Sequence, residues 1–398
     1  MDIRDEAMQL RNEKHQMIKT GLNAKMENSH DLAVVYTPGV AAPCLAIKEE
    51  EDKSLELTWR GNVVAVISDG TRVLGLGDIG PAAAMPVMEG KSALYKRFGN
   101  IDAIPIVLNT KDKDEIVRTI RILEKSFAGI NLEDFSSPKC YDIEDELKAT
   151  MNIPVFHDDQ HGTAIAALAA VLGALRLIKK GIGKAKVVMF GAGAAGTAIA
   201  RLLLEDGVKP ENMTVLNSKG ILYDDGRLNR VQKELAKQVN PENRQGTFAD
   251  AVKGADILLA TSAPAAFKEM HKEAIKTMAE KNVVFAMANP IPEMMLSDAQ
   301  ELGVYVFGTG RSDMPNQVNN SSVFPGLFRG ALDVRARQIN EPMKLAAAHA
   351  LADLVSDEEL KPEYVVVDVF DPRVPHAVAK ASAKAAIESG VARVTELP

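Results

Sequence analysis

Short apolar runs alternate with amphipathic stretches along most of this chain, and the pattern predicts an α/β architecture. In the first part of the chain, the runs that predict buried strands are 62–67, 103–108, 129–132 and 153–156. Amphipathic stretches at 85–98 and 113–125 predict helices between them. The alanine-rich stretch 162–177 predicts a long helix that connects two domains.

A second series of strands follows, at 187–190, 214–216, 257–260 and 283–288, and 304–307 is expected to close its sheet. The stretches 342–355 and 374–389 return to helix. We therefore expect a first domain over residues 1–160, a second over residues 161–310, and a helical C-terminal segment over residues 311–398 that packs back on the first domain.

Composition excludes several classes of protein. A chain of 398 residues suffices for two domains with large cores, and 46% apolar with 25% charged residues is typical of globular proteins. The formal net charge of −7 argues against nucleic-acid binding, which needs a clustered positive surface. No apolar run reaches the length of a membrane span, and the charged start lacks the apolar stretch of a signal peptide. We therefore expect a cytoplasmic protein with no membrane partner.

Only two cysteines, Cys44 and Cys140, are present. Two cysteines cannot form a disulfide framework or a zinc cluster. We interpret both as small buried apolar residues.

A glycine-rich motif follows the first strand of the second series. Its residues are Gly191, Ala192, Gly193, Ala194, Ala195 and Gly196, and a predicted helix begins at Thr197. This is G-x-G-x-x-G in the strand–turn–helix setting of dinucleotide-binding domains. The glycines let the backbone approach the pyrophosphate, whose charge then lies at the positive end of the helix. The alternative is that they only form a tight turn; we predict a Rossmann-like dinucleotide-binding domain.

The next strand ends in Asn217, where an acidic residue that binds the ribose hydroxyls of NAD is expected. An amide can still bond a hydroxyl and does not repel a 2′-phosphate. Lys219 could attract such a phosphate. The choice between NAD and NADP therefore stays open.

Two acidic motifs follow predicted strands of the first domain. Glu133 and Asp134 come after the strand at 129–132, and Asp158 and Asp159 come after the strand at 153–156. Carboxylates gathered in one crevice repel one another unless a cation joins them, and oxygen ligands favour Mg²⁺ or Mn²⁺. Neighbours on a strand point to opposite faces, so Glu133 and Asp134 can share a metal only if the strand has already become a loop. Without further context, helix caps or solvated loop residues would be the preferred interpretation.

That context is a resemblance to the malic enzyme family, in its short bacterial and archaeal form. It covers almost the whole chain, with many specific motifs in the same order as in the family. Besides the acidic motifs, these are VYTPGV at 35–40, SDGTRVLGLGDIG at 68–80, MEGK at 88–91, ANP at 288–290, NQVNN at 316–320 and FPG at 324–326.

The resemblance implies oxidative decarboxylation of L-malate to pyruvate and CO₂, with reduction of NAD⁺ or NADP⁺ and a requirement for Mg²⁺ or Mn²⁺. It implies that Tyr36 is the proton donor, Lys91 the general base and Arg72 a ligand of a substrate carboxylate. The remaining residues that match the family are the metal ligands Glu133, Asp134 and Asp159, with Asp158 as a supporting neighbour, and Asn289 and Asn320 at nicotinamide and substrate. It also implies a homodimer, in which the active site can be completed across the interface.

The chemistry explains why Lys91 is expected beside the metal. Holding a lysine neutral near pH 7 costs roughly 4–5 kcal/mol unless the site lowers its pKa. A divalent cation and partial burial both lower that pKa. His157 and His161, four residues apart, could bind zinc in principle, but the resemblance assigns the metal to the carboxylates.

Three other functions remain to be distinguished. A malolactic reaction would use the same sites and yield lactate. An amino-acid dehydrogenase also pairs a lysine-bearing substrate domain with a nucleotide domain, but does not need the three metal carboxylates. A non-catalytic nucleotide-binding protein is expected to have lost a catalytic group, and Tyr36, Lys91 and the carboxylates are all present.

Overall fold

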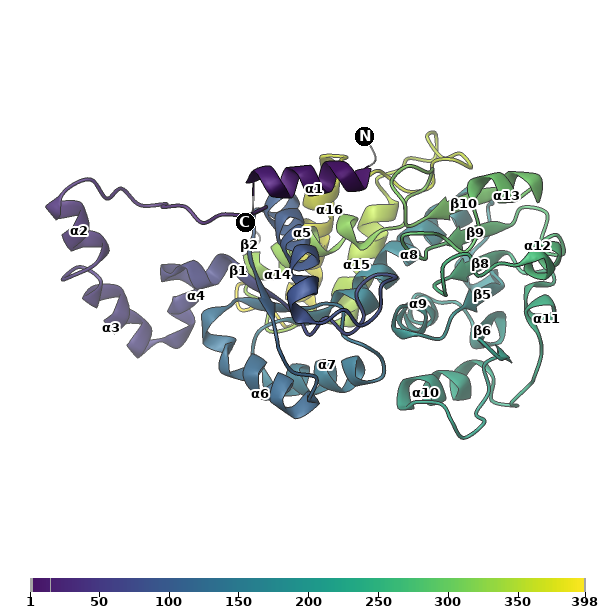
Figure 1. Cartoon of the computed structure of the whole chain (residues 1–398), viewed down its shortest axis with the longest axis horizontal. Helices are drawn as coiled ribbons and strands as arrows, with labels where there is room; N and C mark the ends of the chain where they lie inside the picture. Colours follow the sequence, from purple (N-terminus) through teal and green to yellow (C-terminus); the bar gives the residue numbers. More distant parts are fainter. Residues whose placement is uncertain (1–2, 15, 397–398) are drawn as a thin grey trace.

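Two separate sheets form the framework of the molecule in the computed structural model, which describes residues 3–14 and 16–396 (Figure 1). The first sheet is parallel throughout, in the order β2-β1-β3-β4, and the second has the order β10-β9-β8-β5-β6-β7 with only β7 antiparallel. The strands are β1 Val63–Ser68, β2 Asp102–Val107, β3 Gly129–Leu132, β4 Val155–His157, β5 Val187–Phe190, β6 Met213–Asn217, β7 Gly220–Ile221, β8 Ile257–Ala260, β9 Val283–Ala286 and β10 Val306–Thr309. The predicted α/β class and the Rossmann-like second sheet are confirmed.

Helices cover the sheets and link them. The α-helices are α1 Ile3–Lys14, α2 Ser29–Val35, α3 Ala41–Glu49, α4 Ser54–Leu57, α5 Pro81–Gly99, α6 Lys113–Ile122, α7 Lys139–Thr150, α8 Asp158–Leu177, α9 Ala194–Glu205, α10 Arg230–Val239, α11 Phe248–Val252, α12 Glu269–Ile275, α13 Leu296–Glu301, α14 Phe324–Asp333, α15 Glu341–Ala352 and α16 Arg373–Glu388. The short 3₁₀ helices are η1 Glu51–Lys53, η2 Trp59–Asn62, η3 Glu124–Ser126, η4 Ile182–Lys184, η5 Pro210–Asn212 and η6 Asn320–Ser322.

Helix α8 connects the two sheets and lies in the core. It begins directly after β4 and is lined with small residues, which let α9 and α15 pack closely against it. Among the described residues, α8 is the one helix whose length and apolar composition would suit a membrane span, and 72% of its most apolar window is buried. Packing within the protein therefore accounts for its apolar character.

The C-terminal helices return to the first sheet. Helix α14 packs against α5 and α16, and α15 packs against α8 and α16. The ring centroids of Tyr95 and Phe324 lie 4.7 Å apart, and those of Phe156 and Phe328 lie 5.8 Å apart. This aromatic packing joins α5, β4 and α14 beneath the carboxyl ends of the first sheet.

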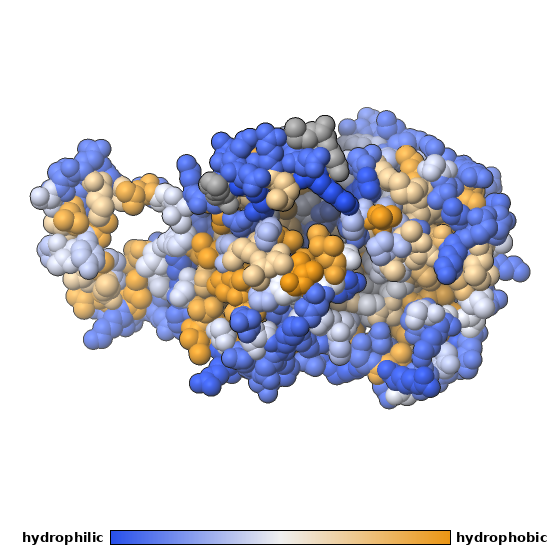
Figure 2. Space-filling view, viewed as in Figure 1, coloured by the Kyte–Doolittle hydropathy of each residue, from blue (hydrophilic) through white to orange (hydrophobic). Residues whose placement is uncertain are grey.

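Residues 17–50, with helices α2 and α3, form an arm, whereas the preceding helix α1 lies on the body (Figure 1). Helix α1 is tied to α5 through Arg11 and Glu89, whose charged atoms lie 2.6 Å apart. Helices α2 and α3 project away from the body (Figure 1), and neither has a buried residue. Apolar side chains on this arm face solvent, as Figure 2 also shows; among them are Leu22, Leu32, Val34 and Leu45.

Several boundaries differ from the sequence-based expectations. The predicted helix at 162–177 begins at Asp158, so both aspartates lie in its first turn. The last strand is 306–309 rather than 304–307. Helices α7 and α14 and the helices of the arm were not predicted. Cys140 is buried as expected, but the interpretation of Cys44 was wrong, because it lies exposed on α3.

Candidate active site

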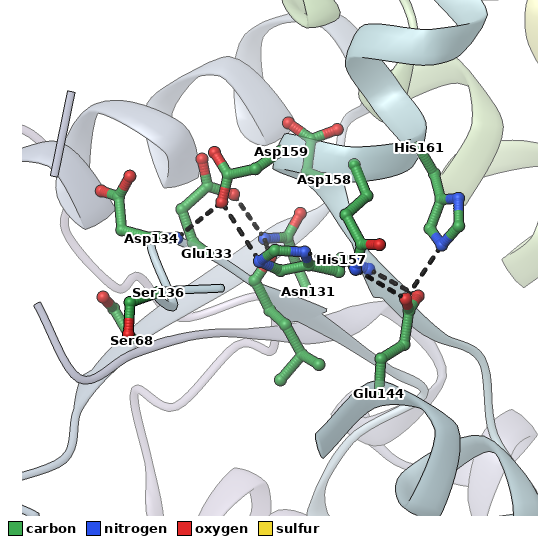
Figure 3. Close-up of polar contacts among 12 residues, drawn as sticks. Ser68, Asn131, Glu133, Asp134, Ser136, Glu144, His157, Asp158, Asp159 and His161 are labelled. Carbon is green, nitrogen blue, oxygen red and sulfur yellow. Dashed lines mark hydrogen bonds and ion pairs between the residues drawn. The ribbon is translucent and has the colours of Figure 1, made fainter. Parts of the chain in front are cut away.

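The acidic residues meet at the carboxyl ends of β3 and β4, which pair as neighbouring parallel strands. Glu133 and Asp134 follow β3, and Asp158 and Asp159 begin α8 directly after β4. Figure 3 shows the side chains of Glu133, Asp134 and Asp159 gathered on the same side of the strands.

Glu133, Asp134 and Asp159 form a cluster that fits a divalent cation. Each offers one oxygen, and these oxygens all lie within 4.8 Å of one another. Asp134 has a φ of 58°, so the strand has ended and the two consecutive carboxylates can face the same point. The Oδ2 atom of Asp134 is buried and has no hydrogen-bond partner. Burial raises the pKa of Glu133 to about 8 and that of Asp134 to about 9, because it removes water from the charged carboxylates.

Lys91 of α5 lies directly beside this cluster and is only 7% exposed. Its Nζ atom is 2.8 Å from Oε1 of Glu133, forms an ion pair with Asp158, and lies 4.3 Å from the centre of the Phe324 ring. Burial alone would lower the pKa of Lys91, but the charges of Asp158 and Glu133 outweigh it and raise the pKa above its ordinary value. Lys91 therefore lies beside the carboxylates that are expected to bind the metal.

Asp158 is more central than its sequence position suggested. It is fully buried, binds Lys91, and accepts a hydrogen bond of 2.5 Å from Nδ2 of Asn320 in η6. A Cβ atom at Gly162, one turn along α8, would lie 1.9 Å from Oδ1 of Asp158. Position 162 must therefore be glycine to leave room for the Asp158 carboxylate. This carboxylate links Lys91, the expected base, to Asn320, which is expected at the substrate.

A second chain of hydrogen bonds orients Glu133. The Tyr95 hydroxyl donates to Oδ1 of Asn131 at 2.7 Å, and Nδ2 of Asn131 donates to Oε2 of Glu133 at 2.9 Å. Sequence reasoning missed both residues. The signal that could have found Asn131 is a polar side chain within an otherwise apolar strand that leads into the acidic motif.

Arg72 and Asn289 lie on loops that meet near the cluster. The backbone N–H of Arg72 donates to the carbonyl of Asp134 at 3.0 Å, while its exposed guanidinium donates to the carbonyl of Leu74. A Cβ atom at Gly75 would lie 3.1 Å from the carbonyl oxygen of Asn289, so the loops of the two sheets touch. The loop of Arg72 thus borders the cluster and meets the loop of Asn289.

The glycine motif forms the turn between β5 and α9. Gly191 has a φ of 121°, and a Cβ atom at Gly196 would lie 1.8 Å from the carbonyl oxygen of Gly191. A Cβ atom at Gly193 would meet no protein atom within 4 Å, so the turn is open on the side where the helix begins. The carbonyl of Ala192 is fixed by Gln232 at 2.7 Å. Residues 191–196 therefore fit a pyrophosphate group.

Asn217 ends β6, as expected. Its Oδ1 accepts from the backbone N–H of Lys219 at 2.8 Å, which leaves the amide nitrogen for a ribose hydroxyl. The Nζ atom of Lys219 lies 2.9 Å from Asp225. Lys219 is thus already paired with an acid.

Tyr36 is the one expected catalytic residue that the chain does not bring to this site. It follows α2 on the projecting arm and is 65% exposed. In residues 3–14 and 16–396, no hydrogen bond joins its side chain to Lys91 or to the acidic cluster, and Figure 1 shows α2 far from α8.

Comparison with known families and relatives gives a consistent result. Residues 12–148 match the model of the malic enzyme N-terminal domain, and residues 160–387 match that of the malic enzyme NAD-binding domain. The chain is 50% identical to a bifunctional malic/malolactic enzyme of Bacillus subtilis, over 100% of this chain and 96% of the relative. It is 49% identical to an NAD-dependent malic enzyme of Geobacillus stearothermophilus, over 96% of this chain and 79% of the relative.

A solved structure has the same fold. The malic enzyme of Pyrococcus horikoshii superimposes with a TM-score of 0.92 at 42% identity, covering 99% of this chain and 93% of the other. The arrangement of both sheets is therefore shared over the whole chain.

Proposed function

We propose that this chain, which belongs to the malic enzyme family, converts L-malate to pyruvate and CO₂ by oxidative decarboxylation, with reduction of NAD⁺ or NADP⁺. The observation that carries the proposal is the position of Lys91, buried between the acidic cluster and Asp158. A base beside a cation site, in a chain that also has a dinucleotide-binding turn, is what oxidation of a hydroxy acid needs.

Glu133, Asp134 and Asp159 would hold Mg²⁺ or Mn²⁺. Such a cation supplies Lewis-acid chemistry, since it polarises the C2 oxygen and stabilises the charge left by decarboxylation. The unpartnered Oδ2 of Asp134 supports this assignment.

The chain's own residues divide the remaining work. Lys91 would remove the proton of the C2 hydroxyl, and the nicotinamide ring, when bound, would supply the acceptor for the C2 hydride. Tyr36 donates a proton to C3 after CO₂ has left, as a general acid. Arg72 binds a substrate carboxylate, for which its exposed guanidinium is suited. Asn289 and Asn320 contact nicotinamide and substrate.

The glycine turn at 191–196 and Asn217 would bind the dinucleotide. Asn217 offers a neutral amide to the ribose, so this position neither requires NAD nor repels NADP. The proposal therefore includes both NAD and NADP as cofactors.

The active form would be a homodimer. The arm of residues 17–50 exposes apolar side chains that a separate chain cannot bury, and it carries Tyr36 away from its own site. An arm that packs on a second copy would cover these side chains and bring Tyr36 to the partner subunit's Lys91. Size-exclusion chromatography with light scattering tests the oligomeric state; a monomer that oxidises malate would exclude this part of the proposal.

The cellular setting and domain limits follow from the same reasoning. We propose a cytoplasmic enzyme that acts on a small molecule, without a nucleic-acid or membrane partner. The proposed division is a catalytic domain over residues 1–160, a dinucleotide domain over residues 161–310 and a returning segment over residues 311–398. It is supported by the fact that each sheet falls within one of the first two parts.

The test is an assay of cofactor reduction with L-malate and Mn²⁺. NAD⁺ and NADP⁺ are supplied separately, each with an EDTA control, and Lys91→Ala is compared with the wild type and with Lys96→Ala on the same helix. We expect metal-dependent reduction with equimolar pyruvate, lost by at least roughly 100-fold in Lys91→Ala only. Turnover of an amino acid that survives EDTA would favour an amino-acid dehydrogenase. Dinucleotide binding without turnover of malate or oxaloacetate would favour a binding protein.

A malolactic reaction is the second candidate, because the relative from Bacillus subtilis is named a bifunctional malic/malolactic enzyme. It would retain the reduced cofactor and return its hydride to the three-carbon product. Lactate formed from malate without net reduction of cofactor would identify this activity.

A further inference from the structure

Beside the acidic cluster lies a chain of buried polar side chains that the proposed reaction does not use. It consists of Glu144 of α7, His157 at the end of β4, and Gln160 and His161 of α8. Figure 3 shows Glu144 and the two histidines, with His157 between Glu144 and the cluster. Glu144, His157 and Gln160 are nearly or fully inaccessible to solvent.

Glu144 is surrounded by donors. The Nζ atom of Lys148 lies 2.6 Å from its Oε1, the backbone N–H of His157 donates at 3.0 Å, and Nε2 of His161 lies 2.9 Å from its Oε2. The ammonium group of Lys344, which can only donate, lies 3.0 Å from Nδ1 of His161. The ammonium group of Lys148 lies farther from the ring, 3.4 Å from Nε2, so the closer Lys344 decides the tautomer: Nε2 of His161 carries the ring proton and donates it to Glu144. Every neighbour stabilises Glu144 as a carboxylate.

That carboxylate sets the direction of the Gln160 amide. The amide nitrogen lies 3.1 Å from Oε2 of Glu144 and 2.9 Å from Nδ1 of His157. A carboxylate only accepts, so the nitrogen and not the oxygen of the amide must face it. Its second proton then points at Nδ1 of His157, which accepts. The proton of a neutral His157 must therefore reside on Nε2.

The Nε2 atom of His157 is buried and lies 3.2 Å from Oδ2 of Asp159, within ion-pair distance but without a formed hydrogen bond. The backbone N–H of Asp134 donates to the same oxygen at 2.7 Å. Both groups thus face Oδ2 of Asp159, which leaves its Oδ1 for a cation.

We infer that Glu144, Gln160 and His157 are positioning residues that hold Asp159 ready for a divalent cation. Glu144 orients Gln160, Gln160 selects the Nε2–H tautomer of His157, and His157 holds Oδ2 of Asp159. The two histidines thus serve hydrogen bonding instead of forming a joint zinc site. Partners of this kind fix the direction of a metal ligand, and their loss typically weakens metal binding by about 10- to 100-fold. The inference rests on the proposed metal site but not on the identity of the substrate.

The first test measures Mn²⁺ affinity in the absence of substrate, from the electron paramagnetic resonance signal of free Mn²⁺. Gln160→Met removes the amide at similar length, His157→Leu removes the donor, and His157→Gln places an amide N–H near the position of Nε2. Glu146→Gln, on the exposed side of α7, is the control. We expect affinity to fall about tenfold or more in Gln160→Met and His157→Leu, and to be largely restored in His157→Gln. Unchanged binding of dinucleotide verifies that each variant is folded.

The second test examines the wild-type protein, and a variant is needed only to assign the His157 signals. Nitrogen-15 chemical shifts of labelled histidine rings report the tautomer of each ring, and the His157 signals are those missing in His157→Gln. We expect the Nε2–H tautomer in the wild type. An Nδ1–H tautomer would overturn the inference, as would wild-type Mn²⁺ affinity in both Gln160→Met and His157→Leu. A wild-type protein that binds no Mn²⁺ would overturn the proposed metal site together with the inference.

Discussion

At the scale of single residues, the site depends on one unusual backbone conformation. Asp134 has positive φ, which aspartate tolerates better than most residues. Because of it, Glu133 and Asp134 leave the strand alternation and face one point, and the N–H of Asp134 reaches Asp159. Strained backbone held in place by its surroundings is common at functional sites. The condition stated from sequence, that the strand must have ended, is met.

A prediction at this scale concerns cofactor choice at Asn217. Asn217→Asp should shift the ratio of kcat/KM toward NAD⁺ and away from NADP⁺ by about tenfold or more, because like charges near a surface repel by about 1–4 kcal/mol at close range. The carboxylate can still accept from the ribose hydroxyls. Steady-state kinetics with both cofactors measure the ratio. Gln300→Glu adds the same charge on exposed α13 and should leave it unchanged; an unaltered ratio in Asn217→Asp would place the ribose elsewhere.

A second residue-scale prediction concerns thiol chemistry. Burial raises the pKa of Cys140 to about 12, so at pH 8 only roughly one thiol in ten thousand is a thiolate. In a Cys44→Ser background, a disulfide reagent should therefore release no colour from the native protein and react fully after denaturation. Rapid reaction in the native state would mean that α7 opens readily. The same assay on the wild type should detect Cys44, which is exposed in the single chain.

At the scale of elements, two glycines in the turn between β5 and α9 have different roles. The fold needs Gly196, whereas a ligand needs Gly193. Gly196 has no room for a Cβ atom, because the carbonyl of Gly191 lies against it. Gly193 has room in the protein, so its lack of a side chain matters only to what approaches from outside. Sequence pattern treats both as members of one motif, whereas the structure assigns them different physical roles.

This difference is testable. Gly196→Ala should lower the free energy of unfolding by about 1–3 kcal/mol, as expected for overpacking. Gly193→Ala should leave the melting temperature nearly unchanged and weaken dinucleotide binding about tenfold, or about 1.4 kcal/mol. Thermal melts and fluorescence titration with reduced cofactor measure the two effects. Equal loss of stability in both variants would contradict the assignment.

Some secondary-structure elements were predicted from the sequence and others were not, for physical reasons. The parallel strands of both sheets were recognisable because buried parallel strands are continuous apolar runs, whereas the short antiparallel strand β7 was not predicted. Helix α14 was not predicted either, because its Phe324-Pro-Gly start resembles a turn, and its helical conformation is stabilised by packing against α5 and α16. Helices α2 and α3 have no buried face in the single chain. Their sequences show no apolar stripe that would indicate an amphipathic helix.

At the scale of the whole molecule, Tyr36 and Lys91 are separated although both belong to the expected reaction. If the arm completes the site of a second copy, two inactive variants can restore each other. Tyr36→Phe and Lys91→Ala, unfolded together and refolded at equal amounts, should regain up to about a quarter of wild-type sites, since half of the dimers are mixed and each has one intact site. Malate oxidation before and after mixing measures this.

The control is each variant refolded alone, which should stay inactive. The formation of mixed dimers is verified by differential tagging. If these dimers regain no malate oxidation, Tyr36 works together with Lys91 of its own chain, after the arm has folded back. Recovery would also account for the exposed apolar residues of the arm, because a dimer contact would bury them.

The sequence by itself determined the α/β class, the strand-to-helix setting of the glycine motif, and the acids at the ends of β3 and β4. These are local properties, because apolar runs and turn residues reflect the burial and backbone needs of their own segments. Only the tertiary structure decided that Lys91 is held by Asp158 and Glu133, that Glu144, Gln160 and His157 lead to Asp159, and that Tyr36 lies apart. Such contacts join residues far apart in the chain, and their geometry arises from how α5, α7 and α8 pack around one sheet.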